Sequence, residues 1–164
     1  MASGPRPGWS LGSSHVGPHV VPVRAARGHL LVTVAELIAW GEGVGRAVRP
    51  PMIIAISGPL GAGKTTLIQA ICRGYGVVEP VTSPTFALVH EYSAPRSRVF
   101  HMDLYRLAGP ADLTLIGWDE IVAAHALIVV EWPERAGDRL PAGHVPIDLE
   151  YVEGDDTRRV LLAG

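Results

Sequence analysis

The apolar residues of this chain fall into short runs, separated by stretches rich in glycine, proline and polar residues. Ala126–Val130 is a continuous apolar run of strand length, which is typical of a central strand covered on both faces. A second apolar run, Met52–Ile56, leads directly into a glycine-rich loop and then into a helical pattern. Strands that alternate with helices in this way predict a single α/β domain with a mostly parallel central sheet and flanking helices.

The first helix is predicted over Thr33–Arg46. Thr33 is suited to cap its N-terminus, and Glu36 follows at the spacing of a capping box. Three glycines lie in the second half, namely Gly41, Gly43 and Gly45. Because glycine lowers helix propensity, we expect this half to fray.

Two further helical segments are expected. One runs from Lys64 to about Gly74, with Gly74 and Gly76 as its C-terminal stop signals. The other is Pro110–Ala124, which reads as two short helices broken near Gly117. The residues of this second segment that we expect to face the core are Leu113, Leu115, Ile116, Ile121 and Val122.

Two antiparallel hairpins are predicted at the margins of the sheet. Phe86–Tyr92 and Arg98–Asp103 have the composition of strands and are joined by a short turn. Val145–Val152 and Thr157–Leu162 flank a polar turn near the end of the chain. The parallel centre is therefore expected to carry a hairpin on one side and a closing hairpin at the end.

Composition supports one folded domain. The chain has 164 residues, of which 48% are hydrophobic and 18% charged, which suits a single globular core. Residues 1 to 27 are rich in glycine and proline and have no helical period, so we expect a disordered tail before a domain over residues 28 to 164. The histidines His15, His19 and His29 lack a neighbouring Cys or carboxylate cluster and are expected to be exposed to solvent.

Charge and cysteine content exclude several classes of partner. The net charge of −2 provides no basic footprint for nucleic acid, so a direct DNA or RNA binder is disfavoured. No run approaches the ~20 apolar residues of a membrane span, and no secretory signal is evident. The only cysteine, Cys72, cannot form an internal disulfide and is expected to be buried. We therefore expect a cytoplasmic protein without a membrane partner.

The strongest chemical signal is Gly58–Thr66. It matches the phosphate-binding pattern G-x-x-x-x-G-K-[ST] and has the strand before it and the helix after it that this motif needs. Its amides and the helix N-terminus would hold phosphate oxygens, Lys64 would reach the β- and γ-phosphates, and Thr65 would ligate Mg²⁺. Lys64 is also the only lysine among the 14 basic residues, so it stands where a compact ammonium is required.

Acidic residues end two of the predicted strands. Asp103 follows Val99–Met102, and Glu131 follows Ala126–Val130. Because the carboxyl ends of parallel strands face the ligand crevice, both acids are candidates for metal binding and for orienting water. A hydroxyl-rich loop with Thr82, Ser83 and Thr85 lies where nucleotide switch loops are found.

Four motifs occur in the order and spacing of one known family. They are Gly61–Thr66, Thr82–Phe86 followed by Glu91-Tyr92, His101–Arg106 and Glu131–Glu134. Together they resemble the TsaE (YjeE) family, the small P-loop ATPases of tRNA threonylcarbamoyladenosine (t6A) biosynthesis. The resemblance covers about Thr33–Leu162.

The resemblance implies an ATPase that does not itself modify RNA. Family members bind the TsaB–TsaD heterodimer, in which TsaD transfers the threonylcarbamoyl group, so tRNA would be reached only through these partners. It also implies ATP and Mg²⁺ as cofactors, with Lys64, Asp103 and Glu131 as catalytic residues and Thr65, Asp103 and Glu131 at the metal. The residues it implies for the nucleotide are Leu60, Gly61, Ala62, Gly63, Lys64, Thr65, Thr66 and Trp132, with Thr33 and Arg158 near the adenine.

Two positions depart from the family pattern. The family usually has an acidic residue where this chain has Pro59, and an aromatic residue where it has Met102. Proline has no N–H, so Pro59 changes the set of donors next to the phosphates. We therefore expect ATP binding together with an altered rate of hydrolysis.

Two other functions fit a phosphate loop in a chain of this size. A small-molecule or nucleotide kinase would need arginines from a lid, and the only arginine-rich loop is Pro95–Arg98. A nucleotide-sensing binding module would need no hydrolysis at all. The first would be revealed by ATP-dependent phosphorylation of nucleosides or nucleotides, and the second by a variant that binds ATP without turnover and still functions.

Overall fold

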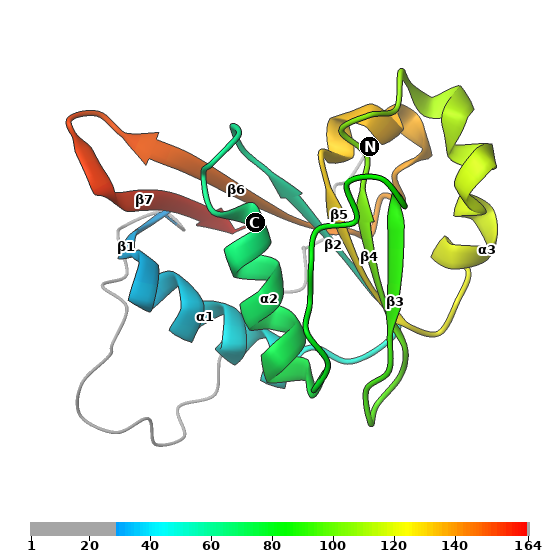
Figure 1. Ribbon diagram of the computed structural model, residues 1–164, viewed down its shortest axis with the longest axis horizontal. Helices are drawn as coiled ribbons and strands as arrows, with labels where there is room; N and C mark the ends of the chain where they lie inside the picture. Colours follow the sequence, from blue (N-terminus) through cyan, green and yellow to red (C-terminus); the bar gives the residue numbers. More distant parts are fainter. Residues whose placement is uncertain (1–28, 164) are drawn as a thin grey trace, which may run out of the picture.

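The computed structural model describes residues 29 to 163 (Figure 1). The tail predicted for residues 1 to 27, with His15 and His19, lies outside these described residues. The elements in chain order are β1 (His29–Thr33), α1 (Val34–Ala47), β2 (Met52–Ser57), α2 (Lys64–Tyr75), β3 (Val89–Tyr92), β4 (Val99–Asp103), the 3₁₀ helix η1 (Pro110–Ile116), α3 (Trp118–Val122), β5 (Leu127–Glu131), the 3₁₀ helix η2 (Pro133–Arg139), β6 (Val145–Val152) and β7 (Asp155–Ala163).

The strands form a seven-stranded sheet in the order β1-β7-β6-β2-β5-β4-β3. The four central strands, β6, β2, β5 and β4, are parallel, whereas β3, β7 and β1 pair antiparallel at the two margins. This confirms the predicted parallel centre and both hairpins. The marginal strand β1 was not predicted. It pairs with β7, where Thr33 lies opposite Arg158, and its short sequence becomes a strand because β7 offers an unpaired edge.

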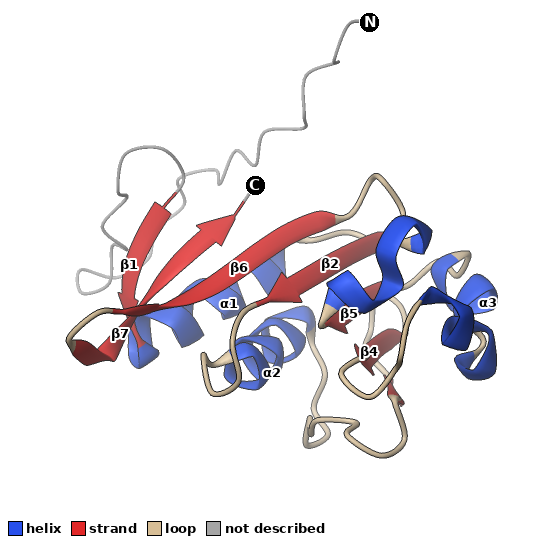
Figure 2. Cartoon of the chain, turned by 90° about the horizontal axis from the view of Figure 1, so that it is seen from above, coloured by secondary structure: helices blue, strands red, loops and turns tan. Residues whose placement is uncertain are grey.

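The two faces of the sheet carry separate apolar clusters. On one face, Ile54, Ile56 and Val129 pack with Leu67 and Ile71 of α2. On the other face, residues of β4 and β5 pack with η1 and α3 around the fully buried Trp118. Figure 2 shows α1 and α2 beneath the sheet and α3 at the end of the sheet that lies away from β1. The strand β5 is buried at every residue, as its apolar run predicts.

The second half of α1 does not fray. The predicted capping box is present, with the Thr33 side chain accepting from the Glu36 amide, and the helix continues to Ala47. Gly41 and Gly45 are buried against α2, and a Cβ at Gly45 would lie 2.1 Å from the carbonyl oxygen of Ile71. These glycines therefore allow two helix backbones to touch, and tertiary packing offsets their low helix propensity.

The α1–α2 contact gives a prediction for Gly45→Ala. We expect a loss of about 1–3 kcal/mol in the free energy of unfolding, because the methyl group meets backbone that cannot rotate away. Gly43→Ala is the matched control, since a Cβ there meets nothing within 4 Å. It should stabilise the protein by about 0.5–1 kcal/mol. Urea unfolding of both variants measures the difference, and equal effects would contradict this account of the contact.

Other local predictions were wrong in detail. Leu115 is 82% exposed rather than inward, whereas Trp118 provides the buried side chain at that place. The strand predicted from Phe86 begins only at Val89, because Leu88 adopts a positive φ of 64° that ends the preceding turn. The helix α2 ends at Tyr75, one residue beyond the predicted end, and Gly76, the second of its two predicted stop signals, is its left-handed cap. Within the described residues no helix is both long and apolar enough to cross a bilayer.

Candidate functional site

The glycine-rich loop joins the end of β2 to the first residue of α2, Lys64. Three of its glycines adopt a positive φ that favours glycine, Gly58 at 143°, Gly61 at 78° and Gly63 at 105°. A side chain at Gly58 would also meet the carbonyl oxygen of Leu149, at 2.5 Å from its Cβ. The loop therefore makes a tight turn directly before a helix N-terminus, the backbone arrangement that binds anions.

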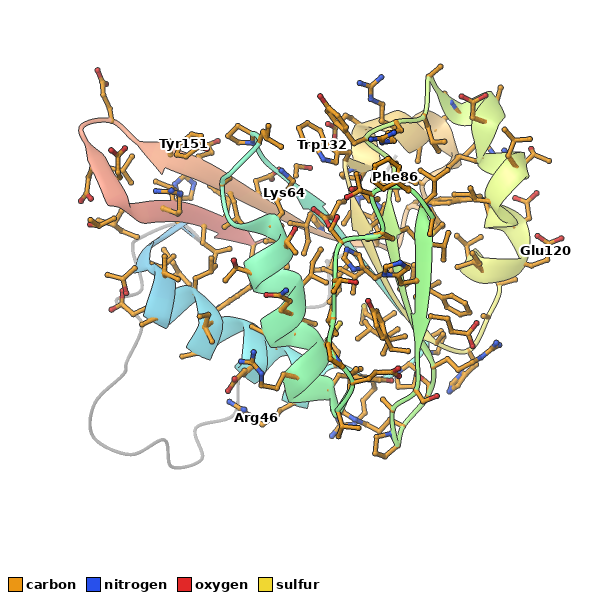
Figure 3. The ribbon with its side chains drawn as sticks, viewed as in Figure 1. Arg46, Lys64, Phe86, Glu120, Trp132 and Tyr151 are labelled. Atoms are coloured by element: carbon orange, nitrogen blue, oxygen red, sulfur yellow. The ribbon has the colours of Figure 1, made fainter. Side chains whose placement is uncertain are left out.

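Lys64 is almost fully buried at the start of α2, with 5% of its surface exposed. Its Nζ donates to the carbonyl oxygens of Gly58 at 2.8 Å and Pro59 at 3.0 Å. The same ammonium lies 4.3 Å from the centre of the Trp132 ring, and both residues are labelled in Figure 3. Burial lowers the pKa of Lys64, while the nearby carboxylates of Glu131, Asp103 and Glu134 act in the opposite direction.

The two predicted acids lie side by side. Asp103 ends β4 and Glu131 ends β5, and their Cα atoms are partners in the parallel register. Glu131 is also the register partner of Ile56 near the end of β2. The side chains are 8% and 3% exposed, respectively. The sheet thus brings both carboxylates to the edge where the phosphate loop begins, which is the edge the sequence predicted.

Asp103 is held by two hydrogen bonds. The amide of Tyr105 donates to its Oδ1 at 3.0 Å, and the hydroxyl of Ser83 donates to its Oδ2 at 3.3 Å. The second bond joins the hydroxyl-rich loop to the acid. A change in the position of this loop would therefore change the hydrogen bonding of the Asp103 carboxylate.

The hydroxyl-rich loop is anchored by its neighbours. The amide of Thr82 donates to the Tyr92 hydroxyl at 3.1 Å, and that hydroxyl donates to the Thr82 carbonyl at 3.2 Å. The Gln69 side chain on α2 donates to the Val81 carbonyl at 2.9 Å. Ser83 also lies 3.3 Å from the hydroxyl of Thr85. The loop is thus tied to β3 and α2 on one side and to Asp103 on the other.

One polar residue of the site was missed by sequence reasoning. His101 is fully buried, and its Nε2 lies 2.7 Å from Oε1 of Glu131. The available signal was the strand period, because residues two apart on a strand share a face and His101 precedes Asp103 by two. The register of β4 against β5 places both on the face that carries Glu131.

Several large aromatic side chains lie on the segments that carry the site. Phe86 is 84% exposed and lies under the guanidinium of Arg106, 4.3 Å from ring centre to Cζ. Tyr105 packs on Trp132 at 4.9 Å between ring centres. On the other side, the hydroxyl of Tyr151 donates to the carbonyl of Leu60. Figure 3 shows Phe86, Trp132, Lys64 and Tyr151 along one side of the molecule. Sequence reasoning gave Phe86, Tyr105 and Tyr151 no role in the site, although Phe86 and Tyr105 lie within the family motifs.

The two residues expected near the adenine lie opposite each other on β1 and β7, at Thr33 and Arg158. The Thr33 hydroxyl already serves α1 as its cap, accepting from the Glu36 amide at 3.3 Å. One helical turn further on, Leu37 lies beside the loop, 3.4 Å from where a Cβ of Gly63 would stand. The start of α1 is therefore close to the loop, and an adenine contact by these two residues stays a prediction.

The donor set fits Mg²⁺ held together with phosphates. Among residues 29 to 163 there is no group of three or more His, Cys, Asp or Glu placed to hold a metal by itself. Mg²⁺ is usually bound through one or two carboxylates, completed by phosphate oxygens and water. Asp103 and Glu131 supply carboxylates, and Thr65 supplies a hydroxyl in the first turn of α2.

Cys72 takes no part in this site. It is fully buried in α2, and burial raises the pKa of its thiol to about 12. A thiol with that pKa is not a nucleophile at neutral pH. This confirms the expected core role.

Comparison with known proteins gives concordant results. The family model described as "Threonylcarbamoyl adenosine biosynthesis protein TsaE" matches residues 31–160. The TsaE protein of Treponema pallidum is 39% identical over 124 residues, which are 76% of this chain and 90% of the relative. That of a Nostoc species is 37% identical over 119 residues, 71% and 72% of the two chains. The crystal structure of Bacillus subtilis YdiB superposes with a TM-score of 0.68 at 27% identity, covering 83% of this chain and 85% of that one.

Proposed function

The chain belongs to the TsaE family, and on that premise we propose that it is an ATP-binding, Mg²⁺-dependent ATP-hydrolysing accessory protein of tRNA t6A biosynthesis. The observation that carries the proposal is the convergence of Lys64, Asp103 and Glu131 at one edge of the sheet. A phosphate loop alone would support only nucleotide binding. Two buried carboxylates beside it support hydrolysis as well.

ATP binding would exchange the partners of Lys64. Its ammonium now bonds to the carbonyls of Gly58 and Pro59, and the phosphates would take their place as stronger, charged acceptors. The amides from Leu60 to Thr66, with the N-terminus of α2, would hold the remaining phosphate oxygens. Pro59 contributes a carbonyl but no N–H, so the altered hydrolysis rate expected from the sequence remains a prediction.

Hydrolysis needs a metal and an oriented water. Mg²⁺, when bound, would neutralise charge on the β- and γ-phosphates. Thr65, Asp103 and Glu131 are the residues that would hold it. A carboxylate can also accept a hydrogen bond from the attacking water, and Glu131 is the buried acid on the strand that pairs with β2, opposite Ile56. Trp132 would shield Lys64 and the phosphates from bulk solvent.

The partner would be a TsaB–TsaD type heterodimer. Monomeric proteins seldom gather large exposed apolar side chains in one place without a binding role. Here Leu60 of the phosphate loop is 76% exposed, and Phe86 and Tyr105, which are 84% and 50% exposed, follow closely on Ser83 and Asp103, which are joined by a hydrogen bond. A partner resting on them would contact the loop and the acid at once. The net charge of −2 favours a protein surface over tRNA, so tRNA would be reached only through the partners, in the cytoplasm.

The direct test combines the purified chain with purified TsaB and TsaD. We expect co-elution on a sizing column in the presence of ATP and Mg²⁺, together with a rate of phosphate release above that of the chain alone. If the partners neither bind nor raise the rate, the assignment loses its main support.

The kinase alternative is weakened by where its arginines lie. Arg96, on the loop between β3 and β4, donates to the carbonyls of Gly45 at 2.8 Å, Val48 at 2.6 Å and Tyr75 at 3.2 Å. It thereby binds the C-terminal ends of α1 and α2. Lys64 begins α2, so Arg96 stands at the far end of a 12-residue helix, roughly 18 Å from the phosphates. An arginine in that position binds the carbonyl groups at the helix ends and is too far away to contact a transferred phosphate.

This gives a prediction for Arg96→Ala. We expect the free energy of unfolding to fall by about 2–4 kcal/mol, because several buried carbonyls lose a charged donor. ATP affinity should stay unchanged. Arg98→Ala is the control, because the exposed Arg98 side chain forms an ion pair with Glu91 at 3.1 Å and lies 5.2 Å from the centre of the Phe100 ring, contacts worth about 1 kcal/mol or less each. Thermal unfolding and ATP titration of both variants decide. Loss of ATP affinity in a folded Arg96→Ala protein would revive the kinase alternative.

A further inference from the structure

The hydrogen bond between His101 and Glu131 lies entirely inside the protein. His101 is fully buried and Glu131 is 3% exposed, and the two residues are 2.7 Å apart at Nε2 and Oε1. A buried carboxylate is costly unless a donor compensates it. When Glu131 is ionised its carboxylate can only accept, and His101 then donates through Nε2–H.

The other nitrogen of the ring indicates what the histidine is for. Among the described residues, Nδ1 of His101 is the buried side-chain polar atom without a hydrogen-bond partner. The neutral tautomer with hydrogen on Nε2 leaves a bare acceptor there, whereas a charged ring would leave an unpaired N–H. The fold therefore supports this side chain through one hydrogen bond only, and that bond goes to Glu131.

The bond also selects which oxygen of Glu131 is free. Oε1 is engaged by His101, and the described residues provide no hydrogen bond to Oε2. Glu131 lies close enough to Lys64 to act on its pKa, so its carboxylate borders the phosphate loop. A carboxylate clamped at one oxygen by a buried neighbour presents the other in a fixed direction.

We propose that His101 is a positioning residue: its Nε2–H fixes the Glu131 carboxylate so that the second oxygen faces the bound nucleotide and Mg²⁺. This inference rests on the proposed ATP hydrolysis. It assigns to His101 no contact with ATP and no proton transfer. Replacing a residue that hydrogen-bonds to a metal ligand commonly lowers metal affinity or activity by about 10- to 100-fold. The loss of the bond between His101 and Glu131 should therefore be measurable.

The test compares two amide variants that differ by one methylene group. In His101→Gln the amide nitrogen can reach the place of Nε2 and donate to Glu131. In His101→Asn the amide falls at the place of Nδ1 and cannot reach it. Both side chains are polar and smaller than histidine, so a mere loss of packing would affect them alike, and thermal unfolding monitors this for each.

Two measurements are made on each protein. A fluorescent ATP analogue reports the Mg²⁺ concentration that half-saturates the nucleotide-bound protein. Phosphate release from ATP, with TsaB and TsaD present, gives kcat and KM for hydrolysis. For His101→Asn we expect a rise in the Mg²⁺ midpoint and a fall in kcat, each about 10-fold or more, with KM and nucleotide affinity in EDTA unchanged. His101→Gln should stay within about threefold of the wild type, because it restores the hydrogen bond.

Equal behaviour of the two variants, or a His101→Asn protein like the wild type, would overturn the positioning role while leaving the proposed function intact. If His101→Asn does not fold, His101→Leu takes its place in the comparison. Absence of turnover in the wild type would instead refute hydrolysis, and the Mg²⁺ titration would still decide the role of His101. If the wild type binds no Mg²⁺ with nucleotide, both proposals fall.

Discussion

Replacing Lys64 by alanine will lower the affinity for ATP roughly 100-fold or more, because at least two charge-assisted hydrogen bonds to the phosphates are lost at about 1.5–3 kcal/mol each. The protein should remain folded. The ammonium is buried at a cost that shows in its lowered pKa, so removing it relieves a desolvation penalty. Isothermal titration with ATP and Mg²⁺, together with thermal unfolding, measures both effects.

Two controls make this result specific. Lys64→Arg keeps the charge, but its wide planar fork does not fit between the Gly58 and Pro59 carbonyls, so it should also bind weakly. Arg73→Ala removes an exposed cation from the last turn of the same helix, where it pairs with Glu42 at 2.9 Å, and should bind ATP normally. Normal ATP binding by Lys64→Ala would contradict the proposal that the phosphate loop binds the phosphates of ATP.

The pH dependence of binding follows from the same burial. Because burial lowers the pKa of Lys64 from its usual 10.5, the lysine loses its proton at a lower pH than an exposed lysine does. ATP affinity should therefore begin to fall with rising pH before pH 10.5 is reached. The Lys64→Ala variant should lack this decline.

Replacing Glu131 by glutamine will leave ATP bound and stop its turnover. The amide has the size of the carboxylate and can still accept from His101, so we expect ATP affinity within about threefold and intact folding. Turnover should fall by about 10²- to 10⁴-fold, because an amide cannot take a proton from water and is a poor ligand for Mg²⁺. Glu131→Ala should bind ATP and fail in turnover likewise.

The readout is phosphate release beside ATP titration, with TsaB and TsaD present. Asp119→Asn is the control, since Asp119 is an exposed acid paired with Arg139 at 2.7 Å. It should behave as the wild type. A Glu131→Gln protein that hydrolyses ATP at the wild-type rate would mean that another residue orients the water.

The parts of the fold that local chemistry dictates were predictable. The capping box at Thr33 and Glu36 starts α1 where expected, and the apolar run ending at Glu131 forms a strand buried at every residue. These features depend on neighbours a few residues apart. The same holds for the phosphate loop, whose pattern places Lys64 at the first residue of α2.

The parts that were not predictable depend on contacts far apart in the chain. Gly45 reads as a helix breaker until Ile71 is placed against it. His29–Thr33 becomes a strand only because β7, more than a hundred residues later, leaves an edge beside it. Propensity describes each residue alone, whereas these outcomes are decided by the segment that packs against it.

The site shows the same division. Motif spacing identified Lys64, Asp103 and Glu131, and the sheet register brings the two acids together. The pairing of His101 with Glu131 needed the register of two strands, and the position of Tyr151 against the loop needed the closing hairpin. The residues proposed to act on ATP are thus visible in the motifs, while the contacts that support them appear only in the folded chain.

The most direct test of the central claim, that ATP turnover at this site serves t6A formation, is made in cells depleted of their own TsaE. The t6A content of total tRNA is measured by mass spectrometry after expression of the wild type, Lys64→Ala or Glu131→Gln at equal protein levels. The account predicts that the wild type restores t6A and that neither variant does. Restoration by Glu131→Gln to the wild-type level, with its turnover abolished in vitro, would contradict the claim and identify the protein as a nucleotide-sensing binding module.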